Sequence, residues 1–467
     1  MISGIFGTGY SDETQPPPSP NDLDKCDTTA LMGLKVAKFG GSSVADAAQL
    51  RKVQAIVEED SDRRIIVVSA PGKRTRDDAK ITDLLYKCHD CARAGTLLDS
   101  VFQIVADRYR GIIRDLGLAI EIEHDLEVVR DGIGRHITPD YAASRGEYLN
   151  ARIVAKLLGC DFVDAADLIR FDASGRLDIE KTVAAVADTL RNGGPVVVPG
   201  FYGAQPDGGI RTFSRGGSDI TGALLARAVR ADVYENWTDV SGVLMADPRI
   251  VSNPRTIPAL SYRELRELAY MGANVLHEEA VFPVIDLNIP VNVRNTNLPG
   301  DPGTLIVKQV NGPSSPITGI AGRKGYTVIA LEKNLMNREV GIGRRLLTAL
   351  ERQQVSFEHM PTGIDTLSLV VESSYLKGKL EPVLEEIRRE CRPDRIDVFE
   401  NVSLIAIVGR GMLQTRGVAG RLFGALASAN VDVRMIDQGS SGINIIVGVE
   451  ERDFETAIRA IYKEFVN

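Results

Sequence analysis

The chain is poor in several features that define whole classes of proteins. Its five cysteines are few and odd in number, which argues against a disulfide framework and favours a reducing compartment. No apolar run reaches the ~20 residues that a membrane-spanning helix requires. The net charge of −8 provides no basic footprint for nucleic acid. We therefore expect no disulfide framework, no membrane partner and no nucleic-acid partner.

Metal motifs and export signals are also scarce. Cys88 and Cys91 have the spacing of half a metal site, but no second cluster completes four ligands, so no metal site is predicted. Residues 1–33 are proline-rich, acidic and without hydrophobic periodicity, and we expect them to be disordered. They lack the basic start and the apolar core of a signal peptide, so a cytoplasmic location is expected.

From residue 35 to about residue 308, short β-branched runs alternate with longer helical patterns. The strand-like runs lie at 64–72, 159–169, 193–203 and 231–242, with amphipathic stretches such as 143–158 and 220–229 between them. This order predicts an α/β fold, in which a largely parallel central sheet carries helices on both faces. Ligands of such sheets bind beyond the carboxyl ends of the strands, where the polar turns collect.

The C-terminal third contains an internal repeat. Residues 328–358 align without a gap on residues 404–434, at a constant offset of 76 (404 − 328 = 76). Each copy has the pattern strand, glycine-bearing loop, helix, strand, strand, helix, which is the ferredoxin-like order. Two copies are too few for a solenoid, which needs about three. The segment 311–316 is the predicted linker, and the copies could be functional units or structural appendages.

A glycine turn after a strand-like run is the first candidate for chemistry. In "KFGGSSV" (38–44), Lys38 ends the run, and Gly40 and Gly41 leave backbone N–H groups open to an anion just before a helix. A lone lysine at a strand end is usually only solvated. The turn is not a Walker A loop, because G-x-x-x-x-G-K-[ST] is absent from the chain. Lys38 beside bare glycine backbone therefore predicts a phosphate site.

A second glycine turn has a similar composition. The segment "SRGGSD" (214–219) places Arg215 and two glycines before Ser218, Asp219 and a helical pattern. Capping of the helix by Ser218 or Asp219 would explain only these two residues. An anion lying on the loop explains the arginine and the glycines as well. We therefore predict both a helix cap and an anion-binding turn here.

Two further segments carry acidic residues that also have a structural interpretation. Glu147 lies in "SRGE" (144–147), where an acidic residue in a helix opening often only complements the helix dipole. The segment "WTDVSGVLMADPR" (237–249) carries aspartates around a glycine turn, and most such aspartates are structural. No serine–histidine–aspartate or cysteine–histidine set stands out among the five histidines.

The order of these motifs resembles that of the aspartate kinases, which have the amino acid kinase fold. The motifs are "KFGGSSV" (38–44), "SRGE" (144–147), "GGSDIT" (216–221), and "WTDVSGV" with "DPR" (237–249). The doubled C-terminal unit resembles the paired ACT domains of the same family, and the resemblance covers about residues 35–467. It implies a catalytic domain at 35–310, a first ferredoxin-like ACT domain at 328–395, and a second made of 313–327 and 398–467.

The resemblance implies transfer of the ATP γ-phosphoryl group to the β-carboxylate of L-aspartate, with Mg²⁺ carried by the nucleotide. The product, 4-phospho-L-aspartate, leads to lysine, threonine and methionine. Phosphoryl transfer needs positioning and charge stabilisation more than covalent catalysis, and a carboxylate needs no general base. Lys38 and Asp219 are the implied catalytic residues. The implied aspartate-binding residues are Ser69, Thr82, Glu147, Phe201, Arg215 and Ser218, and the implied ATP-binding residues are Lys38, Gly40, Gly41, Ser42, Gly216, Gly217, Thr238, Asp239, Asp247 and Arg249.

The chain departs from the family pattern at three points. Asn274 stands where some members have lysine, Leu244 stands at an adenine-contacting aromatic position, and Thr75 competes with Thr82 for the substrate. Thr82 is preferred because "ITDLL" matches the helix start of the family better. Kinases of acetylglutamate or nucleoside monophosphates remain alternatives, against which the paired ACT units argue. A non-catalytic amino-acid sensor is a further alternative, against which the retained catalytic candidates argue.

The resemblance also implies feedback inhibition by an amino acid bound at the ACT units. The predicted effector-site residues of the first copy are Met336, Glu339, Gly341, Ile342 and Glu358. The two carboxylates could receive a cationic ligand, so lysine is favoured over threonine. The ACT units could instead serve only assembly, and a homodimer or homotetramer is expected.

Overall fold

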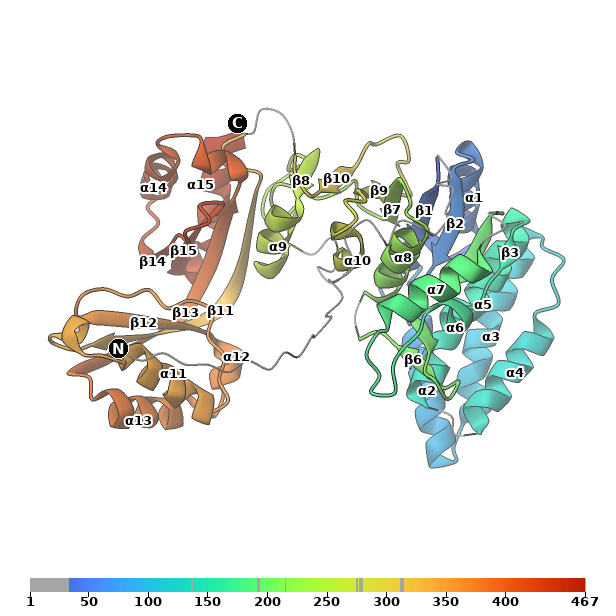
Figure 1. Cartoon of the computed structure of the whole chain (residues 1–467), viewed down its shortest axis with the longest axis horizontal. Helices are drawn as coiled ribbons and strands as arrows, with labels where there is room; N and C mark the ends of the chain where they lie inside the picture. The colour runs from blue at the N-terminus through green and yellow to red at the C-terminus, as the bar shows by residue number, and fades with distance from the viewer. Residues whose placement is uncertain are drawn as a thin grey trace, which may run out of the picture.

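The structure is a computed structural model, and Figure 1 shows how its elements are arranged. It describes residues 33–135, 138–190, 194–214, 216–273, 276, 280–310 and 315–466. The predicted disordered tail lies outside these residues except for residue 33, and most of the predicted linker lies outside them as well. An N-terminal part, blue to yellow in Figure 1, lies beside a C-terminal part whose colours run from gold to red.

The N-terminal part is built on a mostly parallel sheet. Within the described residues its strand order is β3-β4-β2-β1-β7-β9-β10-β8, and only β9 and β10 pair in antiparallel fashion. The strands are β1 (Lys35–Phe39), β2 (Arg63–Val68), β3 (Asp161–Phe162), β4 (Val196–Pro199), β7 (Val233–Thr238), β8 (Ala259–Ser261), β9 (Val291–Asn295) and β10 (Thr304–Val307). β5 (Tyr202–Ala204) and β6 (Ile210–Thr212) form a separate hairpin. The predicted α/β class is confirmed.

Alternate residues of the central strands enter two separate cores, because successive side chains of a strand point to opposite faces. Val36 and Val67 belong to one core, whereas Ala37, Phe39 and Ile66 belong to the other. The helices that cover the second core are α1 (Ala47–Glu59), α2 (Ile81–Ala94), α3 (Leu98–Leu116), α4 (Glu123–Gly134) and α5 (Pro139–Leu158). Those that cover the first are α6 (Ala165–Leu168), α7 (Ile179–Thr189), α8 (Gly217–Ala228), α9 (Tyr262–Tyr270) and α10 (Phe282–Ile285).

The C-terminal part is a single antiparallel sheet of five strands among the described residues, in the order β12-β11-β13-β15-β14. Its strands are β11 (Gly319–Glu332), β12 (Thr366–Glu372), β13 (Arg395–Val408), β14 (Val433–Asp437) and β15 (Asn444–Glu450). One face is covered by α11 (Ile342–Arg352), α13 (Leu380–Cys391), α14 (Val418–Ser428) and α15 (Phe454–Val466), and α12 (Ser373–Leu376) is a short turn of helix. β11 and β13 have 14 residues each and pair along their length, so both copies of the repeat share this sheet.

The two copies differ by one strand. The second copy has the predicted order, with β13, α14, β14, β15 and α15. In the first copy, the stretch between α11 and β12 makes only isolated bridges, from His359 to Val370 and from Thr362 to Leu367. The prediction of two strands after the first helix is therefore wrong for this copy. Pro361 provides a reason, because proline has no N–H group to donate to a strand ladder.

The two parts meet where α9 packs against β11 and β13. Glu264, in the first turn of α9, is fully buried, and its Oε1 accepts hydrogen bonds from Thr318 Oγ1 (2.6 Å) and from the Arg410 N–H (3.1 Å). Asn444 Nδ2 donates to Glu267 Oε2 at 2.6 Å. These partners lie directly before β11, just after β13 and at the start of β15. One helix of the N-terminal part is thus tied to three elements of the C-terminal sheet.

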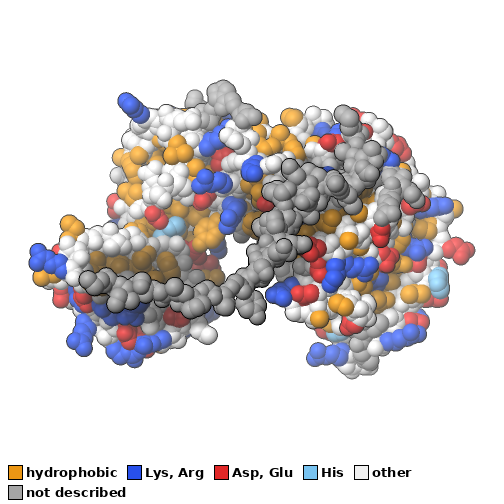
Figure 2. All heavy atoms as spheres, in the orientation of Figure 1, with side chains coloured by type: hydrophobic (Ala, Val, Ile, Leu, Met, Phe, Trp, Pro, Cys, Tyr) orange, Lys and Arg blue, Asp and Glu red, His pale blue; other side chains and the backbone are white. Residues whose placement is uncertain are grey.

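The hydrophobic length of the helices and the charge pattern of the surface complete the description of the fold. None of the helices in the described part of the chain is long and apolar enough to cross a bilayer. On the face shown in Figure 2, positive and negative side chains are interspersed over both parts. The charge visible on this face is therefore mixed rather than gathered by sign.

Candidate active site

The candidate site lies at the carboxyl ends of the adjacent strands β4, β2, β1 and β7. Because these strands are parallel neighbours, the loops that follow them meet at one edge of the sheet. Of the predicted residues, Gly40 directly follows β1 and Ser69 directly follows β2. Phe201 is the second residue after β4. α8 begins at the same edge, since a Cβ atom added at Gly200 would lie 2.6 Å from the Ser218 side chain.

Lys38 and Asp219 form a buried ion pair at this edge. Lys38 Nζ lies 2.5 Å from Asp219 Oδ1, and the lysine is only 7% exposed. Lys38 comes from β1 and Asp219 from the first turn of α8. Asn236 Nδ2, on β7, donates to the same Asp219 oxygen at 2.9 Å. The two predicted catalytic residues are thus in contact, and the ammonium group could turn from the carboxylate to an incoming phosphate.

The turn after β1 is held by backbone contacts. Gly40 N–H donates to Trp237 O (2.9 Å), so the expectation that this N–H group is open to an anion is wrong; the β1–β7 ladder continues into the turn. Gly72 N–H donates to Gly41 O at 2.8 Å. A Cβ atom added at Gly72 would lie 2.6 Å from the Gly41 backbone, so glycine is required where the two turns touch. Ser42 is half-buried in the 3-10 turn that follows.

Ser69 and Thr82 flank the loop between β2 and α2. Asn150 Nδ2, on α5, donates to Ser69 O at 2.7 Å and so fixes the beginning of this loop. Thr82 is the second residue of α2 and is half-buried, whereas Thr75 is exposed in the loop. Of the two threonines, Thr82 is therefore the one held by regular structure.

The sequence suggested that Glu147 lies in a helix opening, and this is wrong. Glu147 is buried in the interior of α5. α5 begins at Pro139, and Thr138 Oγ1 caps it by accepting from the Tyr141 N–H at 3.3 Å. Glu147 is 5% exposed, and its Oε2 has no hydrogen-bond partner among the described residues. Burial raises the pKa of the Glu147 carboxyl to about 8, although hydrogen bonds with the Ala70 backbone act to lower it. A buried carboxylate oxygen without a partner is a candidate for binding a cationic ligand.

α8 begins without a side-chain cap, so the cap predicted for Ser218 or Asp219 is wrong. Its N-cap is Gly216, whose φ of 56° favours glycine, and both predicted residues lie inside the first turn. A helix start without a side-chain cap leaves backbone N–H groups for other acceptors, including an anion. Arg215, predicted to hold the substrate carboxylate, lies outside the described residues.

Phe201 has an unusual backbone conformation beside this helix start. Its φ is 81°, a region that residues other than glycine seldom adopt. Its N–H group donates to Thr221 Oγ1 on α8 at 3.1 Å. A Cβ atom added at Gly217 would lie 2.6 Å from the Phe201 ring, so the phenylalanine and the helix are in close contact. Local strain of this kind is often found at functional sites.

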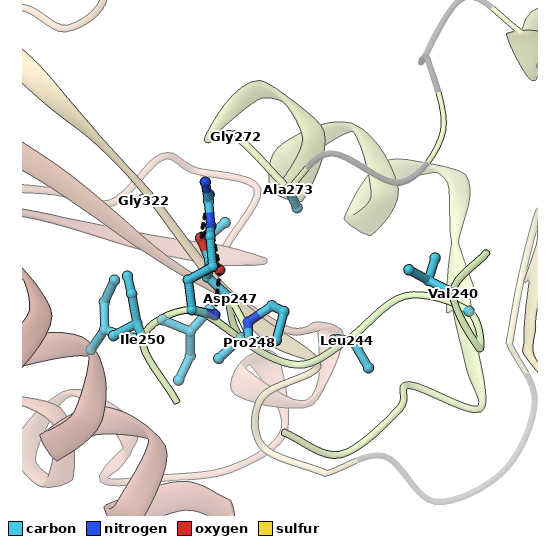
Figure 3. Close-up of a pocket in the computed structure, with 14 residues that line it drawn as sticks. Val240, Leu244, Asp247, Pro248, Ile250, Gly272, Ala273 and Gly322 are labelled. Atoms are coloured by element: carbon cyan, nitrogen blue, oxygen red, sulfur yellow. Dashed lines mark hydrogen bonds and ion pairs between the residues drawn. The ribbon is translucent and has the colours of Figure 1, made fainter. Parts of the chain in front are cut away.

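Four of the predicted nucleotide residues lie at the end of β7 and in the chain that follows it. Thr238 ends β7, and its Oγ1 donates to Asp239 Oδ1 at 3.2 Å. Asp247 and Arg249 pair with each other at 2.6 Å beside a pocket of about 330 Å³ (Figure 3). The lining residues are Val240, Gly242, Leu244, Ala246, Asp247, Pro248, Arg249, Ile250, Gly272, Ala273, Ile320, Ala321, Gly322 and Ile458. Leu244, at the predicted adenine position, lines this pocket, whereas Asn274 lies outside the described residues.

The predicted effector-site residues have different surroundings in the C-terminal sheet. Met336 is buried, Gly341 caps α11 with a φ of 82°, and Ile342 is the first residue of that helix. Glu339 forms ion pairs with Lys333 (2.6 Å) and with Arg345, so its carboxylate is already neutralised. The expectation that Glu339 is free to receive a cation is therefore wrong.

Glu358 differs from Glu339. Its Oε2 is buried without a hydrogen-bond partner among the described residues. Burial raises the pKa of the Glu358 carboxyl, Glu372 adds to this effect, and His359 opposes it. Of the two predicted carboxylates, Glu358 is the one with a buried oxygen that has no hydrogen-bond partner in the described part of the chain.

Three polar residues that hold the site loops were missed by sequence reasoning. Asn236 contacts Asp219, Asn150 fixes Ser69, and Arg108 on α3 contacts the loops after β1 and β2. All three are buried, and a buried polar residue normally requires a partner. For Arg108 the available signal was its helical spacing from the apolar Val105 and Ile112, which does not identify the partner. The two asparagines stand among charged neighbours, and no pattern in the sequence marks them.

Comparison with known proteins agrees with these motifs. The profile of the amino acid kinase family matches residues 33–295, and that of an ACT domain matches residues 405–465. Aspartokinase 3 of Bacillus subtilis is 37% identical over 450 residues, which cover 92% of this chain and 98% of that protein.

Solved structures lead to the same group of proteins. The aspartate kinase of Clostridium acetobutylicum superimposes with a TM-score of 0.88 and 53% identity, over 92% of this chain and all of that one. Aspartokinase III of E. coli with aspartate and ADP (R-state) gives a TM-score of 0.71 at 28% identity, over 93% of this chain and 100% of that chain. The same E. coli enzyme with lysine and aspartate (T-state) gives 0.71 at 27% identity, with the same coverage.

Proposed function

The chain belongs to the amino acid kinase family, among the aspartate kinases that carry ACT domains, and from this premise we propose that it phosphorylates the β-carboxylate of L-aspartate with ATP. The observation that carries the proposal is the buried Lys38–Asp219 pair at the sheet edge, between two glycine turns. The product would be 4-phospho-L-aspartate, the first intermediate toward lysine, threonine and methionine.

The chemistry requires charge stabilisation rather than a covalent intermediate. Lys38 would neutralise the transferring phosphoryl group, with Asp219 and Asn236 holding the ammonium in place before the nucleotide arrives. Gly41 and Ser42 would hold phosphate oxygens, as would Gly216 and Gly217 at the start of α8. The substrate carboxylate is itself the nucleophile, so no side chain has to act as a base.

Recognition of aspartate would rest on opposite charges at its two ends. Glu147 would bind the α-ammonium group, because its buried Oε2 has no other partner in the described chain. Arg215 would pair with the α-carboxylate, since a planar guanidinium matches a planar anion. The remaining proposed aspartate contacts are Ser69, Thr82, Phe201 and Ser218.

The nucleotide would extend from the glycine turns toward the residues after β7. The proposed contacts there are Thr238, Asp239, Asp247 and Arg249. Mg²⁺ bound with ATP would neutralise phosphate charge. The described residues contain no group of three His, Cys, Asp or Glu that could hold a metal ion, so phosphate oxygens would supply most of its ligands. This donor set fits an ion that arrives with the nucleotide.

An acyl-phosphate assay tests the reaction directly. Incubating the protein with ATP, L-aspartate and hydroxylamine would trap 4-phospho-L-aspartate as a hydroxamate. We expect a signal that requires aspartate, ATP and Mg²⁺. Parallel reactions with N-acetylglutamate and with a nucleoside monophosphate test the related kinases. No aspartate-dependent product from folded protein would contradict the proposed function.

Glu147 predicts a pH dependence of aspartate binding. Only the ionised carboxylate attracts an ammonium group, and its pKa is about 8, so the KM for aspartate should fall as the pH rises from 6.5 toward 8. Well below the pKa, the change approaches a factor of about 10 per pH unit. Steady-state kinetics between pH 6.5 and 9 measure this slope. The variant Glu147→Gln should show a higher KM that no longer varies with pH; an unchanged slope would contradict this role.

The same shift has a consequence for stability with the opposite sign. The folded protein holds the Glu147 proton more tightly than the unfolded chain does, because the pKa of this carboxyl has its ordinary value of 4.5 in the unfolded chain. The stability contributed by the protonated form is therefore present below pH 4.5 and is lost as the pH rises toward about 8. The ammonium group of bound aspartate would then offset the free-energy cost of ionising the buried Glu147 carboxyl.

We further propose that the C-terminal sheet is a regulatory part that binds a feedback inhibitor, with lysine as the preferred ligand. The proposed domains are a catalytic domain at 35–310, a first ACT domain at 328–395, and a second ACT domain made of 313–327 and 398–467. One support is the buried Glu358 Oε2, which has no hydrogen-bond partner in the described chain. The other is the contact of α9 with the C-terminal sheet, through which a change in the sheet could reach the N-terminal part. ACT units of two chains would pair in a homodimer or homotetramer.

Lysine should lower activity at subsaturating aspartate, and Glu358→Ala should relieve this inhibition. The variant removes the carboxylate that would receive the ε-ammonium group, so the inhibitory constant should rise roughly 10- to 150-fold, since a hydrogen bond to a charged group contributes about 1.5–3 kcal/mol. Uninhibited turnover should not change. Glu351→Ala, at an exposed position on α11, is the matched control. Titrations of lysine, threonine and both together measure the response; flat curves without a shift in Tm would leave the sheet as an assembly surface.

A further inference from the structure

A buried guanidinium group on α3 has no place in the reaction described above. Arg108 is 8% exposed and lies on the apolar face of the helix, between Val105 and Ile112. Burying a charge is costly unless it is paired and hydrogen-bonded. The position of its partners therefore indicates why a charge is retained here.

All three partners of Arg108 belong to the loops of the candidate active site. Its Nη2 donates to Ala45 O (3.1 Å) and to Gly72 O (2.6 Å), and its Nη1 lies 2.6 Å from Asp78 Oδ2. Ala45 ends the glycine turn that follows β1. Gly72 and Asp78 belong to the loop between Ser69 and Thr82. One side chain thus holds the turn after β1 and the loop after β2 together.

The backbone also ties these loops to each other. They touch through backbone, where Gly72 N–H donates to Gly41 O at 2.8 Å and no side chain fits. Asp78 also accepts from Arg74 Nε (2.9 Å), so it links the exposed tip of the loop to Arg108. The hydrogen bond with Arg74 is the main reason why the pKa of Asp78 lies well below its usual range, and Arg108 adds to this effect. The loop is thus anchored by a carboxylate that stays ionised.

We propose that Arg108 is a positioning residue that fixes the turn after β1 and the loop after β2 at the separation that phosphoryl transfer requires. This inference rests on the proposed function. Arg108 donates to its three acceptors from two separate nitrogens of a rigid plane, a geometry that the single ammonium nitrogen of lysine on a flexible stem does not reproduce. Misplacement by about 1 Å through a residue outside the reacting groups can cost roughly 100-fold in rate.

The kinetic test compares Arg108→Lys with Arg110→Lys. Arg110 is on the same helix, is 39% exposed in its side chain, and pairs with Glu123 and Asp107, away from both loops. We expect Arg108→Lys to lower kcat by about 10- to 100-fold, with a smaller change in the KM for aspartate, and Arg110→Lys to behave as wild type. Wild-type kcat in folded Arg108→Lys, or a loss matched by the fraction unfolded, would overturn the proposal.

A second measurement does not depend on activity. The loop carries exposed Lys73, Arg74 and Arg76, which are trypsin sites. Limited digestion with mass spectrometry should show faster cleavage in this loop for Arg108→Lys and for Asp78→Asn, but not for Arg110→Lys. Unchanged cleavage in both loop variants would overturn the proposal. Absence of aspartate-dependent activity in the wild type would instead contradict the proposed function, and the digestion would still test Arg108.

Discussion

Replacing Lys38 with alanine should lower kcat by roughly 10²–10³, because removal of one electrostatic contact to a transition state typically costs this much. Lys38 is buried and paired with Asp219 at 2.5 Å, so no surface lysine can take its place. The charge is needed most while the phosphoryl group moves, and the KM for aspartate should therefore change little. Initial rates over a matrix of ATP and aspartate concentrations separate the two constants.

Lys35→Ala is the control for this result. Lys35 begins the strand that leads to Lys38 and pairs with Asp60 at 2.6 Å, at the opposite end of β1. Its removal should leave kcat unchanged. If Lys38→Ala raised only the KM for ATP, the lysine would serve nucleotide binding rather than the chemical step.

Replacing Arg63 with alanine should destabilise the N-terminal part by about 3–5 kcal/mol, the usual cost of leaving one member of a buried ion pair without its partner. Arg63 Nε lies 2.7 Å from Glu235 Oε2, and both side chains are 4% exposed. Trp237 Nε1 donates to the same oxygen at 2.9 Å, but it brings no charge. Arg294 lies farther away, at 3.7 Å. The Glu235 carboxylate would thus lose its nearest cation inside the protein.

The chain carries its own probe for this experiment. Trp237 is the single tryptophan, and it lies directly beside the Arg63–Glu235 pair. Urea unfolding followed by its fluorescence should show a lower midpoint for Arg63→Ala. Arg130→Ala removes an exposed pair with Asp131 and should leave the midpoint in place. Equal midpoints for the two variants would mean that Glu235 finds another partner or becomes protonated.

The main sheet and the glycine turns that carry Lys38 and Asp219 could be predicted because each depends on local sequence. Continuous β-branched runs with helical stretches between them specify a parallel sheet. The polar turns of such a sheet collect at the carboxyl ends of its strands. Lys38 and Asp219 were both found in glycine turns of this kind. The start of α5 was also available, since Thr138 before Pro139 is a common helix opening, and Glu147 is well inside that helix.

What could not be predicted depends on contacts between distant segments. Glu339 is neutralised by Lys333 and Arg345, neither of which stands at a helical spacing of three or four residues from it. The Gly40 N–H group is occupied by Trp237 O, almost 200 residues away in the chain. Arg108 illustrates the same limit, because a lone arginine in an apolar helix face does not disclose which loops it holds.

The long strands β11 and β13 make the first copy of the repeat a nested insertion within the second. Tyr326 and Val402 are paired neighbours, so the chain leaves the second copy and re-enters it at adjacent points. An entire copy could be excised, duplicated or exchanged at that junction without opening the sheet that remains. The architecture would thus let one copy be replaced as a unit, while the contact with the N-terminal part at Glu264 stays in place.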